Sequence, residues 1–148
     1  MTQYSEPRSP GEPEDSARRA KKFAGRRPHR VLVVDDDSLI RWAVAESLRT
    51  AGYDVVEAAD AASALRALRS RIDAELVFLD LRLPDTDDLR LLAAIRQLWP
   101  HLPVILMTAH GDDELQGDAL RLGAFTVLNK PFEMSDVGFL ARSALAGC

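Results

Sequence analysis

Five short strand-like stretches, four of them mainly apolar, alternate along the chain with longer segments in which apolar residues recur every three or four positions. The stretches lie at residues 31–34, 54–57, 76–79, 104–107 and 125–128, and each has the length of a β-strand. A segment whose apolar residues have helical spacing follows each stretch, at residues 38–51, 61–71, 89–99, 112–122 and 135–146. Five strand–helix units of this length predict an α/β fold, namely a doubly wound, five-stranded parallel sheet with right-handed crossovers and helices on both faces.

Residues that commonly start or end helices support these boundaries. Ser38 is the expected N-cap of the first helix and Asp60 that of the second, because short polar side chains accept hydrogen bonds from the free amides of a first turn. Gly52 and Gly123 follow the first and fourth helices, where glycine readily adopts a left-handed conformation. Pro100 ends the third helix because its ring cannot continue the hydrogen-bond ladder.

Composition narrows the class of protein. Of the 148 residues, 47% are hydrophobic and 28% are charged, and no apolar run is long enough to cross a membrane. The one cysteine, Cys148, can form neither an internal disulfide nor a metal cluster. We therefore expect one compact domain in the cytoplasm, without a membrane span.

Charge separates an N-terminal arm from this domain. The net charge is −3 over residues 1–15, +7 over residues 16–30 and −8 over residues 31–148. Residues 1–29 also contain several prolines and almost no large apolar side chains, so we expect a disordered arm, acidic and then basic, before a domain over residues 30–148. Only Phe23 interleaves with the basic residues and the domain is acidic, so nucleic-acid binding is not expected and a solubilising tail or a tether is favoured.

Polar residues stand where four of the predicted strands end. Asp35 and Asp36 follow the first strand, Asp80 the third, and Thr108 the fourth, and Asn129-Lys130-Pro131 comes after the last. The carboxyl ends of parallel strands meet at one edge of the sheet and form its ligand crevice. Carboxylates, a hydroxyl and an ammonium in one crevice are typical of a site that forms an acyl phosphate on aspartate.

Such a cluster of carboxylates requires a counter-charge. Like charges about 4 Å apart repel by roughly 4 kcal/mol at an effective dielectric near 20. Mg²⁺ prefers oxygen ligands and commonly binds one or two carboxylates together with a phosphoryl oxygen. One carboxylate can then act as the nucleophile toward phosphorus, with the metal and Lys130 neutralising the developing charge. Lys130 is the only lysine after residue 30, in a segment that otherwise uses arginine.

Four segments together resemble a known family. They are Val-Val-Asp35-Asp36-Asp37, Asp80-Leu-Arg-Leu-Pro84, Met107-Thr108-Ala109 and Lys130-Pro131-Phe132. Over residues 30–146 the chain resembles the receiver domains of bacterial two-component response regulators, and it is most similar to receivers of the NtrC type. This resemblance implies a flavodoxin-like strand order, 2-1-3-4-5, and a location in the bacterial cytoplasm.

The resemblance also implies roles for individual residues. Asp80 would accept a phosphoryl group from a histidine kinase, and Mg²⁺ would be bound by Asp35, Asp36, Asp80 and the backbone carbonyl of Arg82. The bond between Lys130 and the following proline would be cis.

Two further residues respond to the phosphoryl group in this family. Thr108 would hydrogen-bond the group and Lys130 would pair with it, repacking the face made by the helix at 112–122, the strand at 125–128 and the helix at 135–146. Val127 fills the position at which the family usually carries an aromatic switch residue, and Asp88 replaces a loop glycine. The implied partners are a histidine kinase or phosphotransfer protein and a downstream protein that contacts this face, and a homodimer is left open.

Three hypotheses remain. Because the chain stops after its last predicted helix, the first is a stand-alone receiver without an output domain that acts through phosphorylation-dependent protein contacts. Val127 and Asp88 permit a second, a phosphorylation-independent adaptor with the receiver fold. The third is an enzyme, because Asp35-Asp-Asp37 also resembles the nucleophile motif of haloacid-dehalogenase-type phosphatases, with Asp35 as the nucleophile.

Overall fold

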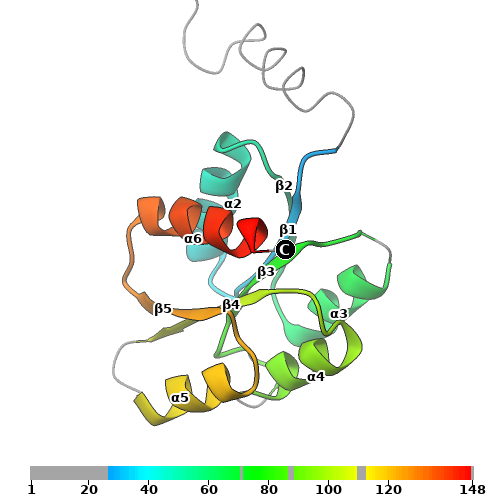
Figure 1. The fold of residues 1–148 in the computed structure, drawn as a ribbon, viewed down its shortest axis with the longest axis vertical. Helices are drawn as coiled ribbons and strands as arrows, with labels where there is room; N and C mark the ends of the chain where they lie inside the picture. The colour runs from blue at the N-terminus through cyan, green and yellow to red at the C-terminus, as the bar shows by residue number, and fades with distance from the viewer. Residues whose placement is uncertain (1–26, 71, 87–88, 110–112, 148) are drawn as a thin grey trace, which may run out of the picture.

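The computed structural model describes residues 27–70, 72–86, 89–109 and 113–147. Its centre is a five-stranded parallel sheet in the order β2-β1-β3-β4-β5 (Figure 1). The strands are β1 (Arg30–Val34), β2 (Asp54–Ala58), β3 (Leu76–Asp80), β4 (Val104–Ala109) and β5 (Thr126–Lys130). Both the predicted fold class and the implied strand order are confirmed.

Helices cover the sheet on both faces, as predicted. They are α2 (Ser38–Thr50), α3 (Ala61–Arg69), α4 (Arg90–Leu98), α5 (Asp113–Arg121) and α6 (Met134–Ala146). Buried residues of α2 and α6 join one core cluster, whereas buried residues of α3, α4 and α5 join the other. Figure 1 shows the same division, with α2 and α6 on one side of the sheet and the other three helices opposite.

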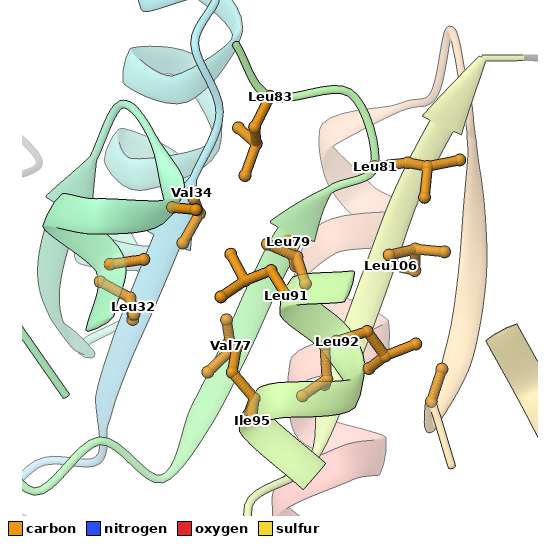
Figure 2. Close-up of a cluster of buried hydrophobic side chains, with 14 of the residues drawn as sticks. Leu32, Val34, Val77, Leu79, Leu81, Leu83, Leu91, Leu92, Ile95 and Leu106 are labelled. Carbon is orange, nitrogen blue, oxygen red and sulfur yellow. The ribbon is translucent and has the colours of Figure 1, made fainter. Parts of the chain in front are cut away.

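Each core cluster takes alternate residues from the central strands. In β1, Leu32 and Val34 belong to the cluster under α3 and α4, whereas Val31 and Val33 belong to the cluster under α2 and α6. This alternation follows from the two-residue period of a β-strand. Strand β3 is buried along its whole length, which explains its continuous apolar sequence from Leu76 to Leu79. Figure 2 shows the first cluster, with side chains of β1, β3 and β4 meeting those of α4.

The N-cap of α2 differs from the predicted residue. Asp37, and not Ser38, has the extended backbone of a cap, and its carboxylate accepts hydrogen bonds from the amides of Leu39 at 3.0 Å and Ile40 at 3.2 Å. Both residue types cap helices well, so local preference could not separate them. The position is set by Asp35, whose side chain accepts a 2.9 Å hydrogen bond from the Asp37 amide and thereby closes the turn one residue earlier.

The other predicted boundary residues behave as expected. Asp60 caps α3 and forms a reciprocal capping box with Ser63. Gly52 and Gly123 have φ values of 102° and 106°, in the left-handed region that favours glycine. The peptide bond between Lys130 and the following proline is cis, as the family resemblance implies.

The first described residues lie against the segment that leads into β3. Arg27 pairs with Asp73 at 3.4 Å, and the ring of His29 lies 2.9 Å from the carboxylate of Glu75. Residues 1–26 of the predicted arm, and also Asp88 and Cys148, lie outside the described residues. Among the described helices, none combines the length and the apolar character needed to cross a bilayer.

Candidate phosphorylation and metal site

Strand register brings the predicted polar residues to one edge of the sheet. Val34 is paired with Leu79, so Asp35 and Asp80 leave neighbouring strands at the same level. On the other side, Thr108 is opposite Asn129, next to Lys130 at the end of β5. Residues separated by up to 95 positions therefore meet at the carboxyl ends of β1, β3, β4 and β5.

Lys130 bridges two buried carboxylates in this crevice. Its Nζ lies 3.0 Å from Oδ2 of Asp35 and 3.2 Å from Oδ1 of Asp80. Asp35 is 0% exposed and Asp80 is 5% exposed, whereas the Lys130 side chain is 21% exposed. One ammonium thus faces two buried carboxylates, which leaves a negative excess in a poorly solvated place.

That excess changes the proton affinity of Asp80. Burial, followed by the charge of Asp35, raises the pKa of Asp80 from 3.8 to about 6, although the charge and hydrogen bond of Lys130 oppose the rise. Burial acts to lower the pKa of Lys130, but its hydrogen bond to Asp35 and the two carboxylate charges together raise that pKa above its usual value. Lys130 therefore stays protonated, and a second cation would relieve the remaining repulsion.

The geometry of the acidic side chains fits a divalent cation. One carboxylate oxygen from each of Asp35, Asp36 and Asp80 lies within 4.8 Å of the others. Asp36 is exposed, so an ion held here would keep contact with solvent. Mg²⁺ requires oxygen ligands and retains several waters, and this donor set meets both requirements.

Backbone amides orient the two buried carboxylates. Oδ1 of Asp35 accepts from the Asp37 amide at 2.9 Å, and Oδ1 of Asp80 accepts from the Arg82 amide at 3.4 Å. The backbone of Arg82 therefore turns directly beside Asp80, in the region where the resemblance implies a carbonyl ligand. The Arg82 side chain itself is exposed.

Thr108 and Val127 lie near this crevice without joining its ion pairs. Thr108 is 2% exposed, and its hydroxyl donates to the Ala109 carbonyl at 3.4 Å. Within the described part of the chain, that hydroxyl makes no hydrogen bond to Asp80 or Lys130. Val127 is half-buried on β5 and packs against the core cluster under α3 and α4.

Two residues that support the crevice were not anticipated from the sequence. Arg41 of α2 donates a 2.8 Å hydrogen bond to the backbone carbonyl of Asp35, and its Nε lies 3.1 Å from the carboxylate of Glu57 on β2. A basic residue one turn after the N-cap Asp37 is a weak signal, because such residues are commonly solvated.

The second unanticipated residue is Asp85, in the loop that follows β3. Its two carboxylate oxygens accept from the amides of Ala61 at 2.8 Å and Ala62 at 3.0 Å, at the N-terminus of α3. Nothing in the local sequence of Asp85 indicates this contact, because its partners are 24 and 23 positions away. The loop beside the candidate phosphorylation site is thereby attached to α3.

Comparison with known proteins identifies the family. The sequence model of the response regulator receiver domain family matches residues 31–138 of this chain. The transcriptional regulator NtrC of Escherichia coli K12 is 40% identical over 116 residues, which are 78% of this chain and 24% of NtrC. The response regulator FleR of Pseudomonas aeruginosa is 40% identical over 117 residues, again 78% of this chain and 24% of the relative. The chain thus spans about a quarter of the length of these curated relatives.

Solved structures agree with the sequence comparison. The receiver domain of NtrX from Brucella abortus superposes with a TM-score of 0.76 and 39% identity, covering 80% of this chain and 99% of that one. A CheY-like receiver from Methanospirillum hungatei gives a TM-score of 0.76 at 28% identity, covering 81% of this chain and 95% of that one. The chain therefore belongs to the family of response regulator receiver domains, with homologues among the NtrC-type regulators of two-component signalling.

Proposed function

We propose that this receiver accepts a phosphoryl group on Asp80 from a partner histidine kinase or phosphotransfer protein, with Mg²⁺ as cofactor. The observation that carries the proposal is the position of Asp80. It is a buried carboxylate at the carboxyl end of β3, hydrogen-bonded to Lys130 and close enough to Asp35 and Asp36 to share a cation with them.

The chemistry needs one free nucleophilic oxygen and a compensated negative charge. Oδ1 of Asp80 is engaged by Lys130 and Arg82, whereas Oδ2 accepts no hydrogen bond from the described residues. In the proposed reaction an Asp80 oxygen forms a bond to phosphorus as the bond from phosphorus to the donor's imidazole nitrogen breaks. Asp35, Asp36 and Asp80 would hold Mg²⁺, which would supply positive charge near the phosphoryl oxygens. Lys130 remains anchored by Asp35 while its ammonium pairs with the new group.

The same contacts argue against Asp35 as a phosphatase nucleophile. Oδ1 of Asp35 accepts from the Asp37 amide and Oδ2 from Lys130, so each oxygen already has a partner. Asp35 is also fully buried. These contacts favour an orienting and metal-binding role for Asp35 and leave Asp80 as the acceptor.

Signalling would pass through the face formed by α5, β5 and α6. The added charge would draw the Thr108 hydroxyl toward Asp80, since among the described residues that hydroxyl has only a 3.4 Å hydrogen bond to the Ala109 carbonyl. Val127 on β5 is smaller than the aromatic residue usual for the family, so a smaller rearrangement would accompany the change. Leu120 and Phe125 are half-exposed along this face and would contact a partner protein.

Mass spectrometry can test the phosphoacceptor. The protein would be incubated with Mg²⁺ and a small phosphodonor beside Asp80→Asn and beside Asp36→Asn, which keeps the acceptor but loses one metal ligand. We expect one phosphoryl group on wild type, none on Asp80→Asn and slower labelling of Asp36→Asn. Undiminished labelling of Asp80→Asn would overturn the assignment and redirect it to Asp35.

A second measurement separates a switch from an adaptor that keeps only the fold. Beryllofluoride mimics the acyl phosphate, and amide NMR signals report each element separately. We expect signals of Thr108 and of residues in α5 and β5 to move when beryllofluoride and Mg²⁺ are added. Movement confined to residues around Asp80 would support the phosphorylation-independent adaptor instead.

A further inference from the structure

A second hollow lies at the edge of the sheet opposite the phosphorylation site. This cavity, of about 440 Å³, is bounded by residues that come just before β1, β3 and β4, together with the end of α6. We call it the amino-edge cavity, and its lining includes His29, Glu75, Leu98, Trp99, Pro103 and Leu145. Because strands are parallel, their amino ends and their carboxyl ends face opposite edges, so the cavity is remote from Asp80.

The walls of the amino-edge cavity are mainly apolar. Trp99 is half-buried, and Leu98 beside it is 51% exposed. Large apolar side chains that surround a hollow of this size commonly mark a binding surface, because their contact with water is unfavourable. The polar lining residues are His29, Glu75 and His101, and the first two, both partly exposed, pair with each other at 2.9 Å. An occupant with one large apolar side chain would suit this arrangement.

The N-terminal arm joins the domain beside this cavity. Arg27 is held by Asp73 at 3.4 Å, and the Arg30 amide donates to Glu75 at 3.1 Å. His29, between them, lines the cavity itself. Phe23 precedes Arg27 by four positions, so it can lie no more than about 14 Å from that anchored residue. The arm therefore starts within reach of the hollow.

The composition of the arm matches both the cavity and the domain. Phe23 is the only large apolar residue between positions 16 and 29, and it is surrounded by basic residues. Residues 16–30 carry a net charge of +7 against −8 for residues 31–148. Attachment to the same chain gives Phe23 an effective concentration of the order of millimolar, so a weak contact suffices for occupancy.

We propose that the arm docks on its own domain, with Phe23 seated in the amino-edge cavity against Leu98 and Trp99. The occupant is a segment of the same chain, and the contact is intramolecular. Docking covers the amino edge and leaves the carboxyl edge, with Asp80, open. The proposal does not depend on phosphorylation, so it stands or fails separately from the proposed function.

The full chain can be tested by NMR, using its two tryptophans. Trp99 lines the cavity, whereas Trp42 lies in the first half of α2, which begins at the carboxyl edge, and serves as the internal control. We expect Phe23→Ser to shift the Trp99 indole signal and the amide signals of residues 98–102, and to leave Trp42 unchanged. Tyr4→Ser removes the other aromatic residue of the arm and should shift neither. Phe23→Leu should restore most of the wild-type spectrum.

Three results would overturn the proposal. The first is a Trp99 signal that is identical in wild type and Phe23→Ser. The second is a difference that fades on dilution, which would show a contact between two chains. The third is a result of urea unfolding. If Phe23 and Leu98 share one contact, Phe23→Ser should lower the unfolding midpoint of the wild type but not that of the Leu98→Ser variant. Equal shifts in both backgrounds would place Phe23 elsewhere.

Discussion

The guanidinium group of Arg41 donates a 2.8 Å hydrogen bond to the backbone carbonyl of Asp35. The same group pairs with Glu57, and Glu57 also pairs with Arg49 at 3.2 Å. Helix α2 and strand β2 thus hold the backbone from which a proposed metal ligand projects. The Arg41 side chain is 20% exposed, so this contact is partly shielded from water.

Removal of this support should weaken Mg²⁺ binding without removing a ligand. Loss of a residue that orients a metal ligand typically lowers metal affinity by about 10- to 100-fold, and we expect Arg41→Ala to fall near the lower end. Arg66→Ala removes an exposed arginine from α3 and is the matched control. Calorimetric titration with Mg²⁺ measures both. Equal affinities for the two variants would show that Arg41 does not position Asp35.

The pKa of Asp80 should depend on Lys130. Burial and Asp35 raise this pKa to about 6, and the charge and hydrogen bond of Lys130 are the largest of the effects that lower it. We therefore expect Lys130→Met to raise the pKa of Asp80 above about 6, whereas Lys130→Arg, which keeps the positive charge, should change it less. Carboxyl NMR signals followed through a pH titration in the absence of Mg²⁺ give the value directly. A lower pKa in Lys130→Met would contradict the arrangement of charges described above.

Ionised Asp80 should reduce the stability of the metal-free protein at neutral pH. Its folded-state pKa, about 6, is above the ordinary 3.8, so between these values the folded state binds more protons than the unfolded state. The loss of folding stability caused by ionised Asp80 is therefore complete above about pH 6 and disappears as the pH falls toward about 4. We expect Asp80→Asn to be more stable than wild type by about 3 kcal/mol above that range, because each pKa unit corresponds to about 1.4 kcal/mol.

Urea unfolding of wild type and Asp80→Asn at a series of pH values checks this expectation. The difference in unfolding free energy between the two should shrink as the solution is acidified. Added Mg²⁺ should shrink it at neutral pH, because a bound cation stabilises the ionised carboxylate of the wild type. A difference that is constant across the pH series would mean that Asp80 has an ordinary pKa.

Asp85, in the loop after β3, should stabilise the N-terminus of α3. Its carboxylate accepts hydrogen bonds from the amides of Ala61 and Ala62, and loss of such a cap commonly costs about 1 kcal/mol. We expect Asp85→Ala to lower the unfolding free energy by this amount, and Asp85→Asn, which keeps one acceptor oxygen, by about half of it. Chemical denaturation measures both. An unchanged stability for Asp85→Ala would show that Asp60 alone caps the helix.

The elements and the edge that carries the site could be derived from the order of residues along the chain. The first four residues of β3 are all apolar because both faces of the strand are covered, and Asp80 comes directly after them as its last residue. In a parallel sheet that position must lie at the carboxyl edge. Lys130 was identifiable because it follows the last predicted strand and is the one lysine after residue 30. Local spacing and strand direction are enough for such conclusions.

Contacts between distant residues required the folded chain. The sequence could not show that Lys130 divides its hydrogen bonds between Asp35 and Asp80, nor that Arg41 binds a backbone carbonyl. It also could not decide between Ser38 and Asp37 as the helix cap, because the two residue types are equivalent as caps until the side chain of Asp35 binds the Asp37 amide. Such contacts depend on the path of each crossover and on the direction of each side chain, and neither is encoded in the spacing of residues within one element.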